Sequence, residues 1–260
     1  MRRHPTACIS LIALAVAPLA LAGPIDDAVR GMDEGTVRFS YAVRPGVRGD
    51  GENIMINNTW ESRTELLASG CDCDGGPARV SLEVREGTVR RLNACVGGTW
   101  RSRPDDDALD LGEVPPEEAA AFLLGLVRRA RESVAEDAVF PAAVAEGVTV
   151  WPALIDVARD RDRPKEVRTS ALFWVGQAAA EEATRGLESV VGDDGGEMDV
   201  REAAVFALSQ RPSDEAVPAL ARVAKTSPHP ELRETALFWL AQHDDPRVAD
   251  LFEEILLGER

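Results

Sequence analysis

The C-terminal half of the chain repeats itself with a period of about 33 residues. Three eleven-residue strings align without a gap: VRTSALFWVGQ at Val167–Gln177, VREAAVFALSQ at Val200–Gln210 and LRETALFWLAQ at Leu232–Gln242. A degenerate copy, VAEDAVFPAAV, lies 33 residues before the first of them, at Val134–Val144. Self-similarity at this period indicates an array of units that contact only their neighbours.

A second helical string follows each copy. It reads WPAL at 151–154 and VPAL two periods later at 217–220, with Leu187 and Leu251 at the matching positions. Two helices per unit can bury their apolar stripes only by stacking on the next unit. We therefore predict a mainly α fold, in which residues 117–260 form a capping helix and then an α-solenoid of about four repeats.

The N-terminus has the pattern of an export signal. Arg2 and Arg3 precede an apolar run from Ile9 to Leu21, and this run closes on Ala20-Leu21-Ala22. We predict a signal peptide over residues 1–22 and a periplasmic or extracellular protein. The run is shorter than the roughly 20 apolar residues of a membrane span, so we expect no membrane insertion after cleavage. A retained signal that tethers the chain to a membrane is the alternative.

The repeated strings resemble HEAT repeats of the bacterial type related to phycobilisome-lyase HEAT-like proteins, over about half of the chain. The whole chain, with its signal and the segment before the repeats, also resembles exported bacterial HEAT-repeat proteins. The resemblance implies that Arg168, Arg201 and Arg233 pair with neighbouring acids or turn carbonyls. It implies that the first helices bury Val167, Val200, Leu232, Ala171, Ala204 and Ala236. HEAT arrays serve many roles, so the resemblance implies an architecture and no particular activity.

The charge and the missing catalytic motifs exclude several functions. The net charge is −16, and removal of the signal leaves −18, because residues 1–22 hold two arginines and no acid. Such acidity argues against nucleic-acid binding and against a basic membrane-binding patch. The sequence has no phosphate loop, nucleophile elbow or HExxH string, and His229 and His243 are its only histidines after residue 22. We predict that the protein is no enzyme and holds no cofactor and no metal.

The segment before the repeats has strand patterns. Residues 36–44 alternate apolar and polar side chains, and residues 80–84 and 88–96 look like a hairpin around Arg85-Glu86-Gly87. We predict a small antiparallel sheet within a β-rich domain at 23–103, and an acidic, proline-containing linker at 104–116. The sequence gives no placement for residues 57–76, apart from a possible short helix at 61–68.

Three cysteines remain after residue 22. We predict one disulfide, between Cys95 and either Cys71 or Cys73, because adjacent strands can bring these positions together. An enzyme with a thiol-based site in the β segment is an alternative function, as is a HEAT-like lyase or hydroxylase relative. The acidic, glycine-containing strings at 72–75 and 193–197 leave a nonstandard calcium site open as an alternative to solvated turns.

The strongest candidates for ligand binding are aromatic residues and glutamines that recur in the repeats. Each phenylalanine is followed four residues later by a glutamine on the same helix side, which gives a possible peptide-binding ridge of Phe173, Gln177, Phe206, Gln210, Phe238 and Gln242. Trp174 and Trp239 add aromatic surface. The alternative is that these side chains only pack the seams between repeats. We predict an exported scaffold for a protein or peptide ligand, with the pattern break around 140–151 or the loop at 57–76 as further places for a specific site.

Overall fold

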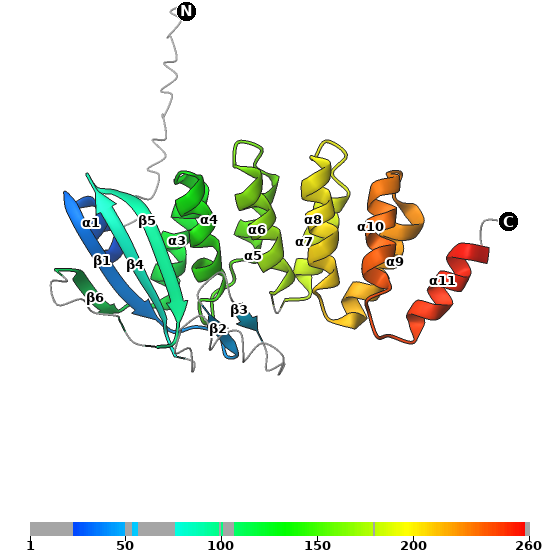
Figure 1. The fold of residues 1–260 in the computed structure, drawn as a ribbon, viewed down its shortest axis with the longest axis horizontal. Coiled ribbons are helices and arrows are strands. Elements are labelled where there is room, and N and C mark those ends of the chain that lie inside the picture. Colours follow the sequence, from blue (N-terminus) through cyan, green and yellow to red (C-terminus); the bar gives the residue numbers. More distant parts are fainter. Residues whose placement is uncertain are drawn as a thin grey trace, which may run out of the picture.

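The computed structural model describes residues 23–49, 54–56, 76–98, 100, 107–178 and 180–257. The predicted signal at 1–22, Cys71 and Cys73, the string at 72–75 and the possible helix at 61–68 lie outside these ranges. Figure 1 shows a small sheet at one end of the molecule and pairs of helices stacked away from it. Among the described helices, none has both the length and the apolar character needed to cross a membrane.

The stacked helices form two rows, and each helix contacts the next one in its own row (Figure 1). The first row consists of α4 (Glu132–Ala143), α6 (Lys165–Gly176), α8 (Met198–Ser209) and α10 (Pro230–Leu240). The second row consists of α3 (Pro116–Arg129), α5 (Trp151–Arg159), α7 (Glu182–Val191), α9 (Ser213–Thr226) and α11 (Arg247–Leu257). This is the predicted α-solenoid, in which α3 caps the array and each later pair is one repeat.

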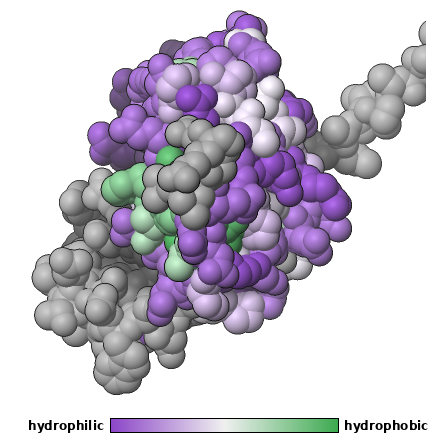
Figure 2. Space-filling model, turned by 90° about the vertical axis from the view of Figure 1, so that its right-hand side faces the viewer, coloured by the Kyte–Doolittle hydropathy of each residue, from purple (hydrophilic) through white to green (hydrophobic). Residues whose placement is uncertain are grey.

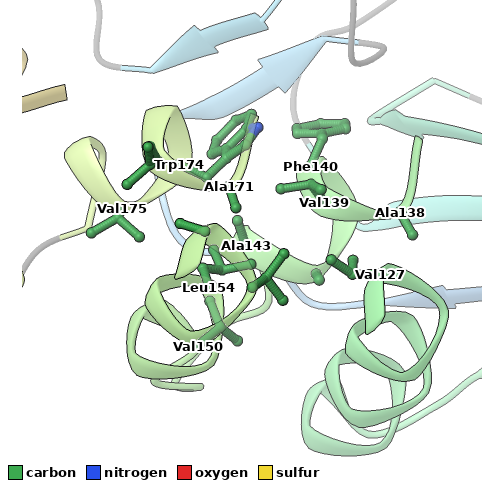
Figure 3. Close-up of a cluster of buried hydrophobic side chains, with 14 of the residues drawn as sticks. Val127, Ala138, Val139, Phe140, Ala143, Val150, Leu154, Ala171, Trp174 and Val175 are labelled. Atoms are coloured by element: carbon green, nitrogen blue, oxygen red, sulfur yellow. The ribbon is translucent and has the colours of Figure 1, made fainter. Parts of the chain in front are cut away.

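The core between the rows is built from the repeated apolar positions. The six residues that the resemblance assigns to the core have at most 2% of their surface exposed. Figure 3 shows the packing where α4, α5 and α6 meet, with Val139, Leu154 and Ala171 in one cluster. Burial of each large aliphatic side chain stabilises the fold by about 1.5–3 kcal/mol, so the array depends on stacking and not on isolated helices.

The backbones of α6 and α8 approach each other closely at Gly176. A Cβ atom at Gly176 would lie 2.7 Å from the carbonyl oxygen of Ala207 and 3.2 Å from its Cα. These are backbone atoms, which cannot move aside as the end of a side chain can. The glycine therefore sets the distance between two neighbouring first-row helices.

In α6, α8 and α10, the arginine near the start of the helix caps the preceding second-row helix. Arg168 donates from Nε to the carbonyl oxygen of Ala158 at 3.0 Å, and Arg201 donates from Nε to Val191 at 2.8 Å. Arg233 binds the carbonyl that follows α9, at 2.9 Å. The last carbonyls of a helix have no partner within it, so these side chains satisfy groups that burial would otherwise leave unpaired. The resemblance implied this role.

The acidic string at 193–197 pairs with two of these arginines. Glu197 lies 2.9 Å from Arg168, and Asp194 lies 3.3 Å from Arg201. Both arginines have only 2% of their surface exposed. These two carboxylates thus compensate the charges of buried arginines. They are not free to act together as calcium ligands.

The sheet has six strands in the order β3-β2-β5-β4-β1-β6. Its strands are β1 (Glu34–Tyr41), β2 (Val47–Gly49), β3 (Ile54–Ile56), β4 (Ala78–Arg85), β5 (Thr88–Val96) and β6 (Leu109–Glu113). The predicted hairpin is present as β4 and β5, and its turn residues Glu86 and Gly87 have φ of 52° and 65°, which matches the twist of paired strands.

Two sequence predictions for this region are wrong. The sheet is mixed and not purely antiparallel, because β6 pairs in parallel with β1. That strand also lies inside the predicted linker at 104–116. It is an edge strand with Leu109 exposed and acids among its residues, so it lacks the pattern of a buried strand. The segment predicted as β-rich also begins with a helix, α1 (Pro24–Arg30).

The sheet and the helices share one core. The apolar residues of β1 point toward α3, where the rings of Phe39 and Phe122 meet edge to face at 6.3 Å between centroids. Val37, Phe39 and Tyr41 are fully buried, as the alternating pattern predicted. The opposite face of the sheet carries the polar residues of β4 and β5, and this face borders α4.

Candidate ligand-binding face

The sheet is attached to the first repeat by hydrogen bonds to backbone carbonyl groups. The Tyr41 hydroxyl donates to the carbonyl oxygen of Pro141 at 2.6 Å, inside the core. The chain after β1 then pairs with the end of α4: the Arg44 N–H donates to Val144 at 2.9 Å, and the Glu146 N–H donates to Ala42 at 3.0 Å. Burial raises the pKa of the Tyr41 hydroxyl far above its usual range, so the neutral donor is the stable form.

This attachment coincides with the degenerate positions of the first copy of the repeat. At the position of the repeated arginine, α4 has Ala135, and at the position of the repeated glutamine the copy has Val144. Val144 accepts the hydrogen bond from Arg44, and Pro141 accepts the one from Tyr41. The sequence departs from the repeat where the sheet docks.

Six aromatic side chains form a continuous row along the first-row helices. Their ring centroids lie 5.2 Å apart from Phe140 to Trp174, 5.4 Å from Trp174 to Phe173 and 6.3 Å from Phe173 to Phe206. The row continues from Phe206 to Trp239 at 4.8 Å and from Trp239 to Phe238 at 5.0 Å. We call these six residues the aromatic row. Each repeat contributes at least one ring to it.

Burial decreases along the aromatic row. Phe140 and Trp174 are buried, and they lie next to each other above the apolar cluster in Figure 3. Phe173, Phe206 and Trp239 are half-buried, whereas Phe238 is 56% exposed. Trp174 thus packs a seam between repeats. Phe238 does not, because more than half of its side chain meets solvent.

Exposed apolar surface at the far end of the array is concentrated in one place. Figure 2 shows this end face-on, with hydrophobic surface near its middle and hydrophilic residues over much of the rest. Partly buried apolar residues of α10 and α11 include Leu237, Trp239, Leu251 and Phe252, and Phe238 of α10 is exposed. An apolar area of this kind on an otherwise charged surface is typical of a contact site.

The repeated glutamines lie directly after the first-row helices. Gln177 and Gln210 are the C-cap residues of α6 and α8, and Gln242 follows α10. Gln210 donates from Nε2 to the hydroxyl of Ser209 at 3.1 Å. Gln210 and Gln242 are exposed. The structure therefore brings the phenylalanines together in one row and places each glutamine at the end of its helix, beside that row.

A groove of about 800 Å³ lies between the polar face of the sheet and the start of the aromatic row. Its sheet wall carries Arg79 and Arg91, and its helix wall carries Glu136, Phe140 and Trp174. The groove therefore has opposite charges on its two walls and aromatic rings at the side of α4 and α6. It opens onto the aromatic row, so the two features form one surface.

Two further side chains border the groove. Trp100 lies under the guanidinium of Arg38, with 5.2 Å from Cζ to the ring centroid, and Arg79 donates to the carbonyl oxygen of Gly97 at 2.9 Å. Cys95 is half-buried on the sheet wall, and both partners proposed for its disulfide lie outside the described residues.

Within the ranges that the structure describes, no three His, Cys, Asp or Glu side chains gather closely enough to hold a metal ion.

Sequence reasoning identified the repeated aromatic residues but not the residues of the groove. Arg79 and Arg91 occupy polar positions of a strand pattern, which is where solvated side chains are expected. The register of the hairpin pairs Ser81 with Asn93 and Arg79 with Cys95, so the residues of its polar face can be predicted from the sequence. The register does not tell which helix borders this face.

Comparison with known proteins assigns the repeats. Residues 151–238 and 195–260 match HEAT repeats, and these two overlapping ranges extend from α5 to the last residue. No curated protein matches the chain. The matched ranges begin after the degenerate α4, in agreement with its altered pattern. The C-terminal region of this chain is an array of HEAT repeats.

Proposed function

We propose that the chain is an exported, non-catalytic scaffold of bacterial origin that binds a protein or peptide along the first-row helices. The aromatic row carries the proposal. It crosses four helices without a break, and it changes from buried rings beside the sheet to an exposed ring at Phe238. Rings required only for stacking would be covered along the whole row.

The shape of this surface favours an extended ligand. Helical repeat arrays offer long surfaces that are assembled from equivalent positions of successive units. Aromatic residues that are held rigidly and remain partly exposed contribute strongly to binding when a partner covers them. The groove beside the sheet provides an end to this surface, where a ligand meets polar walls instead of another ring.

Affinity capture tests the proposal. The chain with residue 23 as its first residue is immobilised and exposed to the secreted or periplasmic fraction of the source cells. We expect a specific partner to be retained by the wild type and lost with Phe238→Ala. Leu109→Ala is the matched control, because Leu109 is 45% exposed on β6 at the opposite end of the molecule.

The outcomes separate binding through the row from other readings. Retention of the same partner by Phe238→Ala and Leu109→Ala alike would remove the aromatic row as the binding surface. Loss with both variants would indicate nonspecific apolar capture. N-terminal sequencing of the exported protein tests export itself, and a start at Gly23 is the expected result.

Thiol counting tests the non-catalytic part of the proposal. Of the three cysteines after residue 22, we expect two in a disulfide and one thiol in the denatured protein. In the native protein we expect that thiol to react slowly with a thiol reagent. Fast modification at neutral pH would instead favour the thiol-based enzyme.

A further inference from the structure

The first-row helices place an acid one helical turn before the aromatic row. Glutamates stand four residues before three of its phenylalanines: Glu136 before Phe140, Glu202 before Phe206 and Glu234 before Phe238. Residues at this spacing lie on the same side of a helix. The remaining helix, α6, has Thr169 at this position. A line of carboxylates therefore runs beside the line of rings.

Within the described residues, these carboxylates are not held in ion pairs, although Glu136 shares the groove with Arg79 and Arg91. In the part of the chain that the structure describes, Glu136, Glu202 and Glu234 form no ion pair. Lys165, the first residue of α6, has its ammonium paired with Asp199 at 2.6 Å. The hydrogen bond from Lys165 and the positive charge of Lys165 lower the pKa of Asp199, as expected for an ion pair.

The opposite side of the row carries the glutamines. A carboxamide has both donor and acceptor atoms, so Gln177, Gln210 and Gln242 suit the N–H and C=O groups of an extended chain, which need partners when covered. Acids on one side, rings in the middle and carboxamides on the other side together describe a ligand with positive charges, apolar side chains and an accessible backbone.

We infer that the partner contacts this surface through an extended, cationic segment in which lysine or arginine residues stand between regularly spaced apolar residues. This inference rests on the proposed function and adds the chemistry of the ligand. Charge complementarity supports it twice: the glutamates lie beside the rings, and the whole chain has a net charge of −16, which accelerates encounter with a basic segment.

The spacing of the helices sets the period of the ligand. Neighbouring helices pack about 8–10 Å apart, and a chain in the extended polyproline-II conformation rises about 3.1 Å per residue with three residues per turn. One repeat therefore corresponds to about three residues of ligand. An apolar residue at every third position, with a basic residue between, would place one apolar side chain on the row for each repeat.

Three labelled synthetic peptides test this inference by fluorescence anisotropy. Each has about twelve residues with leucine at every third position, and the residues between are a mixture of serine with lysine, with glutamine or with glutamate. We expect the lysine peptide to bind about tenfold more tightly than the glutamine peptide and the glutamate peptide to bind weakest. Its affinity should fall as salt is raised from 50 to 300 mM, because screening weakens exposed charge pairs.

A triple variant locates the charge. Glu136→Gln, Glu202→Gln and Glu234→Gln together should reduce the affinity of the lysine peptide about tenfold and leave the glutamine peptide unchanged. The matched control replaces Glu181, Glu182 and Glu253, which are exposed on or beside α7 and α11 in the second row, with glutamine. It makes the same change in net charge, and we expect it to weaken binding less than twofold.

Each remaining outcome overturns the inference. Equal binding of the three peptides, a preference for the glutamate peptide, or equal losses in both triple variants would show that these glutamates do not select a basic ligand. Failure of the lysine peptide to bind would do the same. If Phe238→Ala still abolishes capture of a partner, the proposed scaffold function stands and only the inferred ligand chemistry is wrong. If Phe238→Ala does not abolish capture, both the function and the ligand chemistry are wrong.

Discussion

The junction between the sheet and the first repeat and the junctions between later repeats solve one problem in different ways. Each must cover the carbonyls at the end of a helix. At the sheet, the Tyr41 hydroxyl and the Arg44 N–H do so. Between repeats, the side chains of Arg168 and Arg201 do so. The first solution occurs once, and the second recurs with the period of the sequence.

The difference teaches why the array has a distinct start. An arginine can serve every repeat because its long side chain carries its own donors. A backbone N–H serves only where another chain segment lies at hydrogen-bond distance. The sheet also takes part in the turn after α6. There the Arg44 guanidinium donates to the carbonyl oxygen of Gln177 at 2.6 Å, and the Arg211 guanidinium donates to those of Gly176 and Ala180 at 3.2 and 2.9 Å. The sheet is therefore an integral end of the array.

The largest effect is expected at this shared turn. The Arg211 side chain is 2% exposed and pairs with Glu215 at 2.9 Å. Burial by itself raises the pKa of Glu215, but hydrogen bonds from Thr184 and Arg211 outweigh this and lower it. Arg211→Met removes the positive charge beside that partly buried carboxylate and the donor to the turn carbonyls, so we expect a loss of about 3–5 kcal/mol in the free energy of unfolding, measured in urea.

Arg247→Met is the control for this variant. Arg247 also binds a carbonyl of the preceding repeat, that of Ser213 at 3.0 Å, but its side chain is 48% exposed. Its replacement should change stability much less, because water can take over its contacts. Similar losses in the two variants would contradict the importance of burial at the repeat junction.

A smaller effect is expected where two first-row backbones meet. Gly176→Ala would bring a methyl group against the backbone of Ala207, and we expect a loss of about 1–3 kcal/mol. Gly125→Ala in α3 is the matched control, since its added methyl group meets only the flexible end of Arg129. That change should be neutral or stabilise by up to about 1 kcal/mol. Thermal unfolding of both variants measures this difference. A Gly176→Ala variant as stable as the wild type would contradict the close approach of the two backbones.

The sheet junction should be sensitive to alkaline pH. The free tyrosine hydroxyl has a pKa of 10.0, and burial raises that of Tyr41. The neutral form therefore stabilises the fold fully below pH 10, and this contribution declines as the pH rises above 10, by about 1.4 kcal/mol per unit. Tyr41 is the only tyrosine, so absorbance of the phenolate reports it directly. We expect its ionisation to coincide with unfolding.

Tyr41→Phe separates this titration from other alkaline effects. The variant leaves the carbonyl of Pro141 without a donor and should lose about 1–3 kcal/mol at pH 7. It should also lack the steep decline that begins at pH 10 in the wild type. Ionisation of Tyr41 near pH 10 in the folded protein would contradict the buried hydrogen bond.

The contrast between the junctions also marks what the sequence could predict. The repeats, their helices and their core were predictable because a strict period repeats the same packing problem. The strands β1, β4 and β5 were predictable from alternation. In contrast, β6 has two leucines among acids and lies at an edge, where burial imposes little pattern.

The candidate site was predictable only in part, for a related reason. The rings of the aromatic row recur, so their alignment in space follows from the alignment of the repeats. The groove depends on how Arg79 and Arg91 of the sheet face Glu136 of α4. That arrangement is fixed by Tyr41 and Arg44 at the junction with the sheet. The junction does not recur, so no periodic pattern in the sequence predicts the groove.

The smallest effect on stability is expected at the end of the aromatic row. Phe238→Ala should change the free energy of unfolding by no more than about 0.5 kcal/mol, because this ring is 56% exposed. Trp174→Ala should lose about 3–5 kcal/mol, since that ring is only 4% exposed. Urea unfolding of the two variants measures the gradient along the row. A large loss for Phe238→Ala would mean that the exposed ring supports the fold, and its effect on partner capture would then no longer isolate binding.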